Sequence, residues 1–128
     1  MKLLLDTHLL LWAANTPKKL SKTASKLISD EENVLVFSAA SLWEIMIKSS
    51  LQRADFQVNA SLLRQGLIEN GYIELPILSK HVLTLNALPT IHKDPFDRIL
   101  IAQAITEDLS LLSVDPLVTQ YTGPIIAV

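Results

Sequence analysis

The sequence predicts an α/β fold, a three-layer α/β/α domain with a central, mostly parallel sheet of four to five strands. Short apolar runs without polar alternation recur along the chain, as they do in strands that are buried on both faces. Helix-periodic segments separate these runs, so strands and helices alternate as in βαβ units. The chain has 128 residues, 49% of them hydrophobic, and no interdomain linker, which predicts a single domain over residues 1–128.

The first strand is expected in the run KLLLDT, Lys2–Thr7, where an apolar stretch ends abruptly at Asp6. An apolar helix over Leu9–Ala14 follows. It stops before Pro17, because proline disfavours the helical conformation in the residue that precedes it. A second helix is expected over Lys22–Ser29, with the serine before it as the N-cap.

The second strand, Val34–Phe37, is rich in β-branched and aromatic residues, as strands are. A helix over Ser41–Ser50 follows it, and either Ser38 or Ser41 can be its N-cap. After a loop, the next helix runs over Ala60–Asn70 and is closed by a glycine.

A third, shorter strand is expected over Tyr72–Leu75, and Ser79 is expected to cap a helix that reaches about Ala87. In the segment DPFDRILIAQAITEDL, Asp94 and Pro95 have the residue types of an N-cap and a first helical position, so a buried helix should run to about Glu107.

The last two strands are expected over Leu109–Val114 and Ile125–Val128. The first is an apolar run that ends in an Asp-Pro pair. The second is short and should lie at an edge of the sheet.

The composition excludes several kinds of chemistry. The absence of cysteine excludes thiol catalysis, disulfides and thiolate metal sites, and it fits a reducing compartment. No apolar run approaches the roughly 20 residues of a membrane span, and no secretory signal stands out, so we expect a cytoplasmic protein with no membrane partner. The net charge of −2 argues only mildly against a nucleic-acid partner, because several acids are expected to share one site.

Four acids fall where a parallel sheet would bring them together. Asp6 and Asp115 end strands, and Glu44 and Asp97 lie in the first turns of helices. Strand ends and helix starts of this kind share one edge of the sheet, so the four carboxylates can converge. Two carboxylates about 5 Å apart repel by roughly 3 kcal/mol at an effective dielectric constant near 20, and a hard cation between them relieves that repulsion. Oxygen ligands favour Mg²⁺ or Mn²⁺, and such ions suit hydrolysis of a phosphodiester.

Each of these acids except Asp6 also has an ordinary structural explanation. Glu44 and Lys48 are spaced as an i,i+4 ion pair in the favourable order. Asp97 would be stabilised by the helix dipole at any helix N-terminus. Asp115 can simply begin a turn with the proline that follows it.

Four segments, DTHLLLW, SAASLWEIMIK, HKDPFDRILIAQA and LLSVD, resemble in order and spacing those of PIN-domain ribonucleases of the VapC toxin type. The resemblance covers nearly the whole chain and implies a PIN-like fold. It implies a Mg²⁺- or Mn²⁺-dependent endoribonuclease that cuts RNA phosphodiester bonds as the toxin of a type II toxin–antitoxin pair. It further implies a homodimer and a cognate antitoxin protein. The family's acidic quartet maps onto Asp6, Glu44, Asp97 and Asp115, and its supporting hydroxyl maps onto Thr7.

Several neighbouring residues are weaker candidates. Asp94 is first an N-cap and second an outer ligand of the site, whereas Lys48 and Arg98 are either phosphate contacts or members of ordinary salt bridges. His8 and His92 are expected to be supporting or structural. The tryptophans Trp12 and Trp43 and the lysines Lys18, Lys19, Lys22 and Lys26 remain open between two interpretations each. The tryptophans are either core or partner-groove residues, which is the favoured interpretation, or base-stacking platforms. The lysines form a solvated helix face or a phosphate-contacting patch.

One segment departs from the family pattern. The loop LQRADF, at positions 51–56 after Lys48, lacks the glycine that is usual there. Two other functions also remain open: a phosphotransfer α/β domain that uses Asp6, and a non-catalytic protein-binding module with the same fold. Under the nuclease hypothesis, Asp6→Asn should abolish cleavage and leave the metal-free fold at least as stable, because it relieves repulsion.

Overall fold

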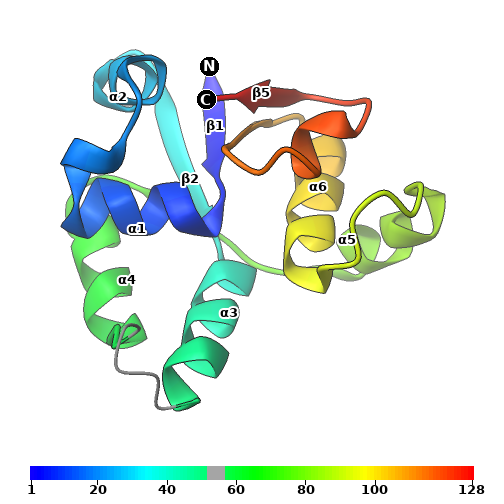
Figure 1. Cartoon of the computed structure of the whole chain (residues 1–128), viewed down its shortest axis with the longest axis horizontal. Helices are drawn as coiled ribbons and strands as arrows, with labels where there is room; N and C mark the ends of the chain where they lie inside the picture. Colours follow the sequence, from blue (N-terminus) through cyan, green and yellow to red (C-terminus); the bar gives the residue numbers. More distant parts are fainter. Residues whose placement is uncertain (52–56) are drawn as a thin grey trace.

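A five-stranded sheet lies between two layers of helices in the computed structural model, which describes residues 1–51 and 57–128 (Figure 1). The strand order is β3-β2-β1-β4-β5, and each neighbouring pair is parallel. The predicted three-layer fold with its parallel sheet is therefore confirmed. The strands are β1 (Lys2–Leu5), β2 (Val34–Ser38), β3 (Ile73–Leu75), β4 (Ser110–Ser113) and β5 (Ile125–Ala127).

The α-helices are α1 (Thr7–Asn15), α2 (Lys22–Ser29), α3 (Ala39–Ser50), α4 (Ala60–Glu69), α5 (Ser79–Thr84) and α6 (Pro95–Glu107). Short 3₁₀ segments lie at Pro17–Lys19, Leu85–Ala87 and Val118–Gln120. None of the described helices is both long and apolar enough to cross a bilayer.

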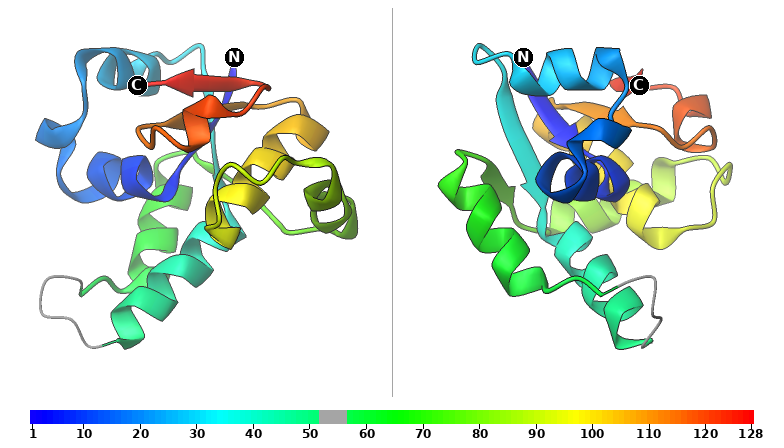
Figure 2. Two further views of the ribbon diagram at one scale, coloured as in Figure 1. Left: turned by 45° about the vertical axis from the view of Figure 1, so that its right-hand side comes forward. Right: turned by 60° about the vertical axis from the view of Figure 1, so that its left-hand side comes forward.

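The central strand β1 shows why the sheet is covered on both faces. Leu3 and Leu5 pack into the hydrophobic cluster formed with α1, α2 and α4, whereas Leu4 packs into the cluster formed with α6 on the other face. All three side chains are fully buried, and burying a leucine is worth about 1.5–3 kcal/mol. Figure 2 shows α1, α2 and α4 on one side of the sheet and α5 and α6 on the other.

Most predicted helix starts are confirmed to within two residues, with physical reasons for the differences. Helix α1 begins at Thr7 rather than Leu9, because Asp6 accepts a hydrogen bond from the Leu9 N–H and so caps it. Of the two serines that could cap α3, it is Ser38 that accepts the Ala40 N–H. The N-cap of α6 is Asp94, as predicted.

The prediction that Ser79 caps a helix is wrong. Ser79 is the first residue of α5, and Leu78 occupies the cap position without a side-chain cap. The Leu78 N–H donates instead to Nδ1 of His81, a buried ring one turn into the helix. The α-helix α5 ends at Thr84 and continues to Ala87 only as a 3₁₀ turn.

The segment LQRADF, whose missing glycine departs from the family pattern, lies outside the described residues except for its first residue, Leu51.

The end of α4 gives a test of the predicted helix stop. Gly71 has φ +87°, a left-handed conformation that is strained for other residues, whereas Gly66 lies inside α4 with open space around its α-carbon. Gly71→Ala should therefore lower the free energy of unfolding by about 1 kcal/mol, and Gly66→Ala should raise it by about 0.5–1 kcal/mol. Urea denaturation of the two variants measures both effects, and a stabilising Gly71→Ala would contradict this account of the helix end.

Candidate metal and catalytic site

Asp6 is held at the junction of β1, α1 and the end of β4. Its Oδ1 accepts the Leu9 N–H at 2.9 Å, and its Oδ2 accepts the N–H of Val114, from the far end of the chain, at 3.2 Å. The residue is 4% exposed. Burial raises the pKa of the Asp6 carboxyl, and hydrogen bonds from Leu9, Ser113 and Val114 oppose that rise. Ionisation of the Asp6 carboxyl is therefore opposed by its burial, but the hydrogen bonds fix the direction of both oxygens.

Thr7 connects the start of α1 to α3. Its Oγ1 donates to Oε1 of Glu44 at 2.6 Å and lies 3.0 Å from Oγ of Ser41, so Ser41 is the donor in the second contact, because a hydroxyl has one proton. Glu44 is 4% exposed, and its Oε2 pairs with Nζ of Lys48 at 2.8 Å. The predicted i,i+4 ion pair exists, but its acid is buried at the sheet edge instead of lying on the surface.

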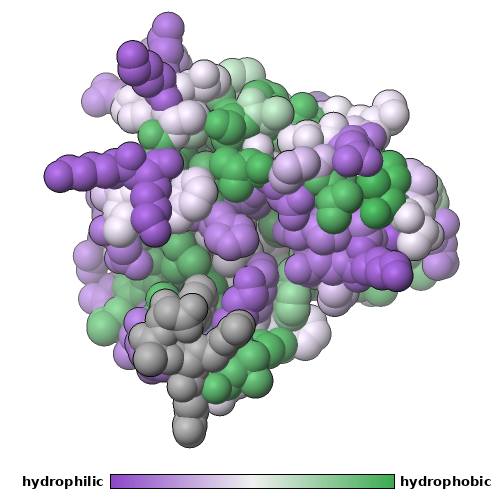
Figure 3. Space-filling model, in the orientation of Figure 1, coloured by the Kyte–Doolittle hydropathy of each residue, from purple (hydrophilic) through white to green (hydrophobic). Residues whose placement is uncertain are grey.

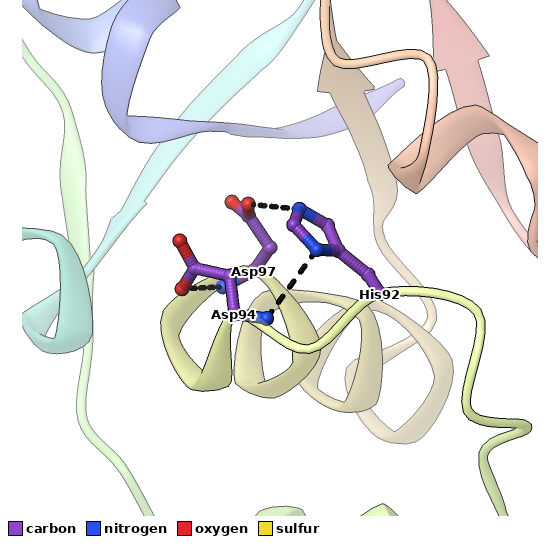
Figure 4. A group of neighbouring side chains, drawn as sticks. All are labelled: His92, Asp94 and Asp97. Carbon is purple, nitrogen blue, oxygen red and sulfur yellow. Dashed lines mark hydrogen bonds and ion pairs between the residues drawn. The ribbon is translucent and has the colours of Figure 1, made fainter.

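His92 lies between the carboxylates of Asp97 and Asp115. Its Nε2 is 2.8 Å from Oδ2 of Asp97 and 3.0 Å from Oδ2 of Asp115. The other ring nitrogen, Nδ1, accepts the Asp94 N–H at 3.3 Å. Figure 4 shows His92, Asp94 and Asp97 grouped over the first turn of α6.

Asp97 experiences the negative charge of the whole group. Burial, followed by the charges of Asp94 and Glu44 and, more weakly, that of Asp115, raises its pKa to about 7, and His92 opposes the rise. Of the four acids predicted to converge at one edge of the sheet, the structure brings Glu44 and Asp115 near Asp97. The described contacts link Asp6 to them indirectly, because the neighbouring Thr7 bonds Glu44 and because Asp6 accepts the N–H of Val114, which precedes Asp115.

The donor set of this edge fits a hard divalent cation. Carboxylate oxygens predominate, and after burial their mutual repulsion is the main cause of the raised pKa of Asp97. Ligand atoms of His92, Asp94 and Asp97 also lie within 4.8 Å of one another. Mg²⁺ or Mn²⁺ would suit these oxygens better than zinc would.

Arg98 has a different role in the structure from either one considered for it. Its guanidinium donates to the backbone carbonyl oxygens of Leu85 at 3.2 Å and of Pro89 and His92 at 3.4 Å. These contacts hold the segment that carries His92 against α6. A contact between Arg98 and phosphate stays a prediction, and the guanidinium is already used by the protein.

Two polar residues at this edge were missed as site residues. His92 was expected to be only supporting or structural, although it stands five residues before Asp97 in HKDPFD. Ser113 is fully buried, bonds the Asp6 side chain and accepts the Asp115 N–H at 3.1 Å. The only signal for Ser113 was a hydroxyl near the carboxyl end of a largely apolar strand, just before Asp115.

The two tryptophans lie in different environments, one packed against the core and one exposed. Trp12 is half-buried and packs against the cluster of α1, α2 and α4, as a core residue does. Trp43 is 59% exposed and stacks edge-on against Phe96 with ring centroids 5.1 Å apart, so it is not a core residue.

The contacts of Asp6 change the expected effect of Asp6→Asn on stability. Both carboxylate oxygens accept main-chain N–H groups, so the NH₂ of an asparagine would face one of these donors. The metal-free variant should lose about 1–3 kcal/mol rather than be as stable as the wild type. Asp97, whose Oδ2 faces the His92 ring, is the better position for a charge-removing test.

The raised pKa of Asp97 predicts that the metal-free protein loses stability as the pH rises. In the folded state Asp97 keeps its proton up to about pH 7, whereas in the unfolded chain it loses the proton near 3.8. Between these values the folded state binds more protons, so the free energy of unfolding falls with rising pH. Asp97→Asn should remove on the order of 1–2 kcal/mol of that fall.

Thermal unfolding in the presence of a chelator, measured across this pH range, checks the prediction. Asp108→Asn is the matched control, because Asp108 is exposed at the other end of α6 and its left-handed backbone suits asparagine. A pH dependence that is the same in Asp97→Asn as in the wild type would contradict the assignment of the proton to Asp97.

Comparison with known proteins agrees with this architecture. A chain in the crystal structure of VapBC2 from Rickettsia felis bound to a DNA fragment from their promoter superposes with a TM-score of 0.69. The two share 15% sequence identity, and the match covers 100% of this chain and 98% of that one, so the likeness is one of fold. Comparison with curated protein sequences gives no match. The model of the PIN domain family matches residues 3–121, and the chain therefore belongs to the PIN domain family.

Proposed function

We propose that this protein is a metal-dependent endoribonuclease of the VapC toxin type, a single domain that hydrolyses RNA phosphodiester bonds. The observation that carries the proposal is the crowding of acids around Asp97, where Asp94, Glu44 and Asp115 all disfavour a further negative charge. Such crowding is tolerable where a cation is bound, and a phosphodiester hydrolase needs one there. Membership of the PIN domain family and the resemblance of the four sequence segments support the same activity, and the VapBC2 neighbour supports the fold.

In the proposed mechanism, Asp6, Glu44, Asp97 and Asp115 hold Mg²⁺ or Mn²⁺. The bound ion would supply an activated water and would stabilise the charge on the leaving oxygen. Asp6 keeps its orientation because two main-chain N–H groups and the Ser113 side chain bind it, and a lone pair of the carboxylate stays open to the ion. Thr7 and Lys48 orient the two oxygens of Glu44. Asp94 fixes the start of α6 and thereby the position of Asp97.

A phosphotransfer role for Asp6 has less support. An acceptor aspartate must expose an oxygen to the incoming phosphoryl group. Asp6 is 4% exposed, and each oxygen already accepts a main-chain hydrogen bond.

We further propose a cognate antitoxin as the protein partner, and a homodimer in the cytoplasm. A groove between α1, α2 and α4 is separate from the acids and could take part of such a partner, because apolar side chains line much of it, among them Leu20, Ile28, Leu62 and Leu67. In Figure 3 hydrophobic surface is visible at several places on the face of Figure 1. Leu78, just before α5, and Val82 and Leu83 on α5 are exposed and available to a second copy. Light scattering of the purified protein measures the oligomeric state.

The test of the proposed activity is cleavage of RNA by the purified protein with Mg²⁺ or Mn²⁺. Asp97→Asn should lower the rate by about 100-fold or more, because replacing even a residue that supports a metal ligand costs 10–100-fold. A chelator should abolish cleavage by the wild type, and Asp108→Asn should cleave at the wild-type rate.

Two results would count against the proposal. Cleavage by Asp97→Asn at the wild-type rate would remove Asp97 from the site. No cleavage of any RNA by a folded wild-type protein that binds neither ion would favour the non-catalytic binding module.

A further inference from the structure

The contacts of His92 determine which of its ring nitrogens carries a proton. Nδ1 accepts the N–H of Asp94 at 3.3 Å, so this nitrogen is unprotonated. Nε2 therefore carries the proton, and it lies 2.8 Å from Oδ2 of Asp97 and 3.0 Å from Oδ2 of Asp115. A single N–H thus serves two carboxylates that belong to α6 and to the end of β4.

The backbone of His92 is held in place independently of its ring. Its N–H donates to the hydroxyl of Tyr121 at 2.8 Å, and its carbonyl oxygen accepts from Arg98 at 3.4 Å. Tyr121 is 5% exposed and belongs to the core cluster on the α6 side of the sheet. The His92 side chain, with 13% of its surface exposed, is thereby presented between the two acids.

We propose that His92 is a positioning residue that holds Asp97 and Asp115 together in the metal-free protein and competes with the cation for them. The inference rests on the proposed function, in which these two acids hold Mg²⁺ or Mn²⁺. A cation that bridged these two oxygens would take the position between them that the Nε2–H occupies, 2.8 Å and 3.0 Å away from them, and a protonated nitrogen cannot itself be a metal ligand. The imidazole must therefore release the carboxylates when the ion binds.

The alternative role, in which His92 is itself a metal ligand, makes the opposite prediction. It would require Nε2 to lose its proton, while the Asp94 N–H already occupies Nδ1. Removing a ligand weakens metal binding, whereas removing a competitor strengthens it. The sign of the change in affinity therefore separates the two roles.

Calorimetric titration with Mn²⁺ at one fixed pH above the pKa of Asp97 tests the inference on wild type, His92→Ala and Asp108→Asn. His92→Ala should bind Mn²⁺ about tenfold more tightly, since hydrogen bonds to charged groups are worth roughly 1.5–3 kcal/mol, which corresponds to a factor of ten or more. Asp108 is exposed at the other end of α6 and its left-handed backbone suits asparagine, so Asp108→Asn is the control and should bind as the wild type does. Equal or weaker binding by His92→Ala overturns the inference.

A second measurement on the wild type does not depend on the folding of a variant. Long-range ¹H–¹⁵N spectra of the metal-free protein should show the His92 ring with its proton on Nε2. Saturating Mg²⁺ should shift the Nε2 signals of His92 and leave those of His81, which contacts Leu78 and Glu107, in place. A proton on Nδ1, or a His92 ring that does not respond to Mg²⁺, overturns the inference.

The outcomes also separate this inference from the proposed function. If neither wild type nor His92→Ala binds Mn²⁺, the proposed metal site fails and the inference fails with it. If both bind Mn²⁺ with equal affinity and the wild type cleaves RNA, the proposed function stands and the role of His92 as a competitor is wrong.

Discussion

Repulsion between carboxylates at one edge of the sheet is the constraint on which the rest of this structure depends. Asp97 lies among Asp94, Glu44 and Asp115, and burial together with the charges of these acids raises its pKa to about 7. A protein gains no stability from such a group, so its presence needs a reason outside folding. The surrounding contacts show how the fold tolerates the repulsion without dispersing the charges.

Each acid at this edge has a particular partner that limits the cost of its burial. Main-chain N–H groups bind Asp6, and Lys48 pairs with Glu44. The N–H of His92 Nε2 serves Asp97 and Asp115 together. None of these partners neutralises the negative charge of the four acids completely, and a bound cation would supply the missing positive charge. The parallel sheet makes the arrangement possible, because strand ends and helix starts meet at the same edge.

The fold and the position of the acids could be predicted because both depend on local signals. Unbroken apolar runs indicate strands buried on both faces, and Asp94 before Pro95 indicates a helix start wherever it occurs. Ser79 looked like a cap by the same rule, and the prediction failed. Nδ1 of His81, a residue made buried by packing of α5 against α6, takes the Leu78 N–H instead.

The sequence by itself determined the alternation of strands and helices and the placement of Asp6, Glu44, Asp97 and Asp115 at element ends, because these follow from neighbouring residues. Only the tertiary structure decided what each polar side chain contacts. His92 bridges two acids, Ser113 supports Asp6, and Arg98 donates to backbone carbonyls. Such contacts join residues that are far apart in the chain or that lie on different elements. Their geometry depends on how the layers pack, which no local pattern encodes.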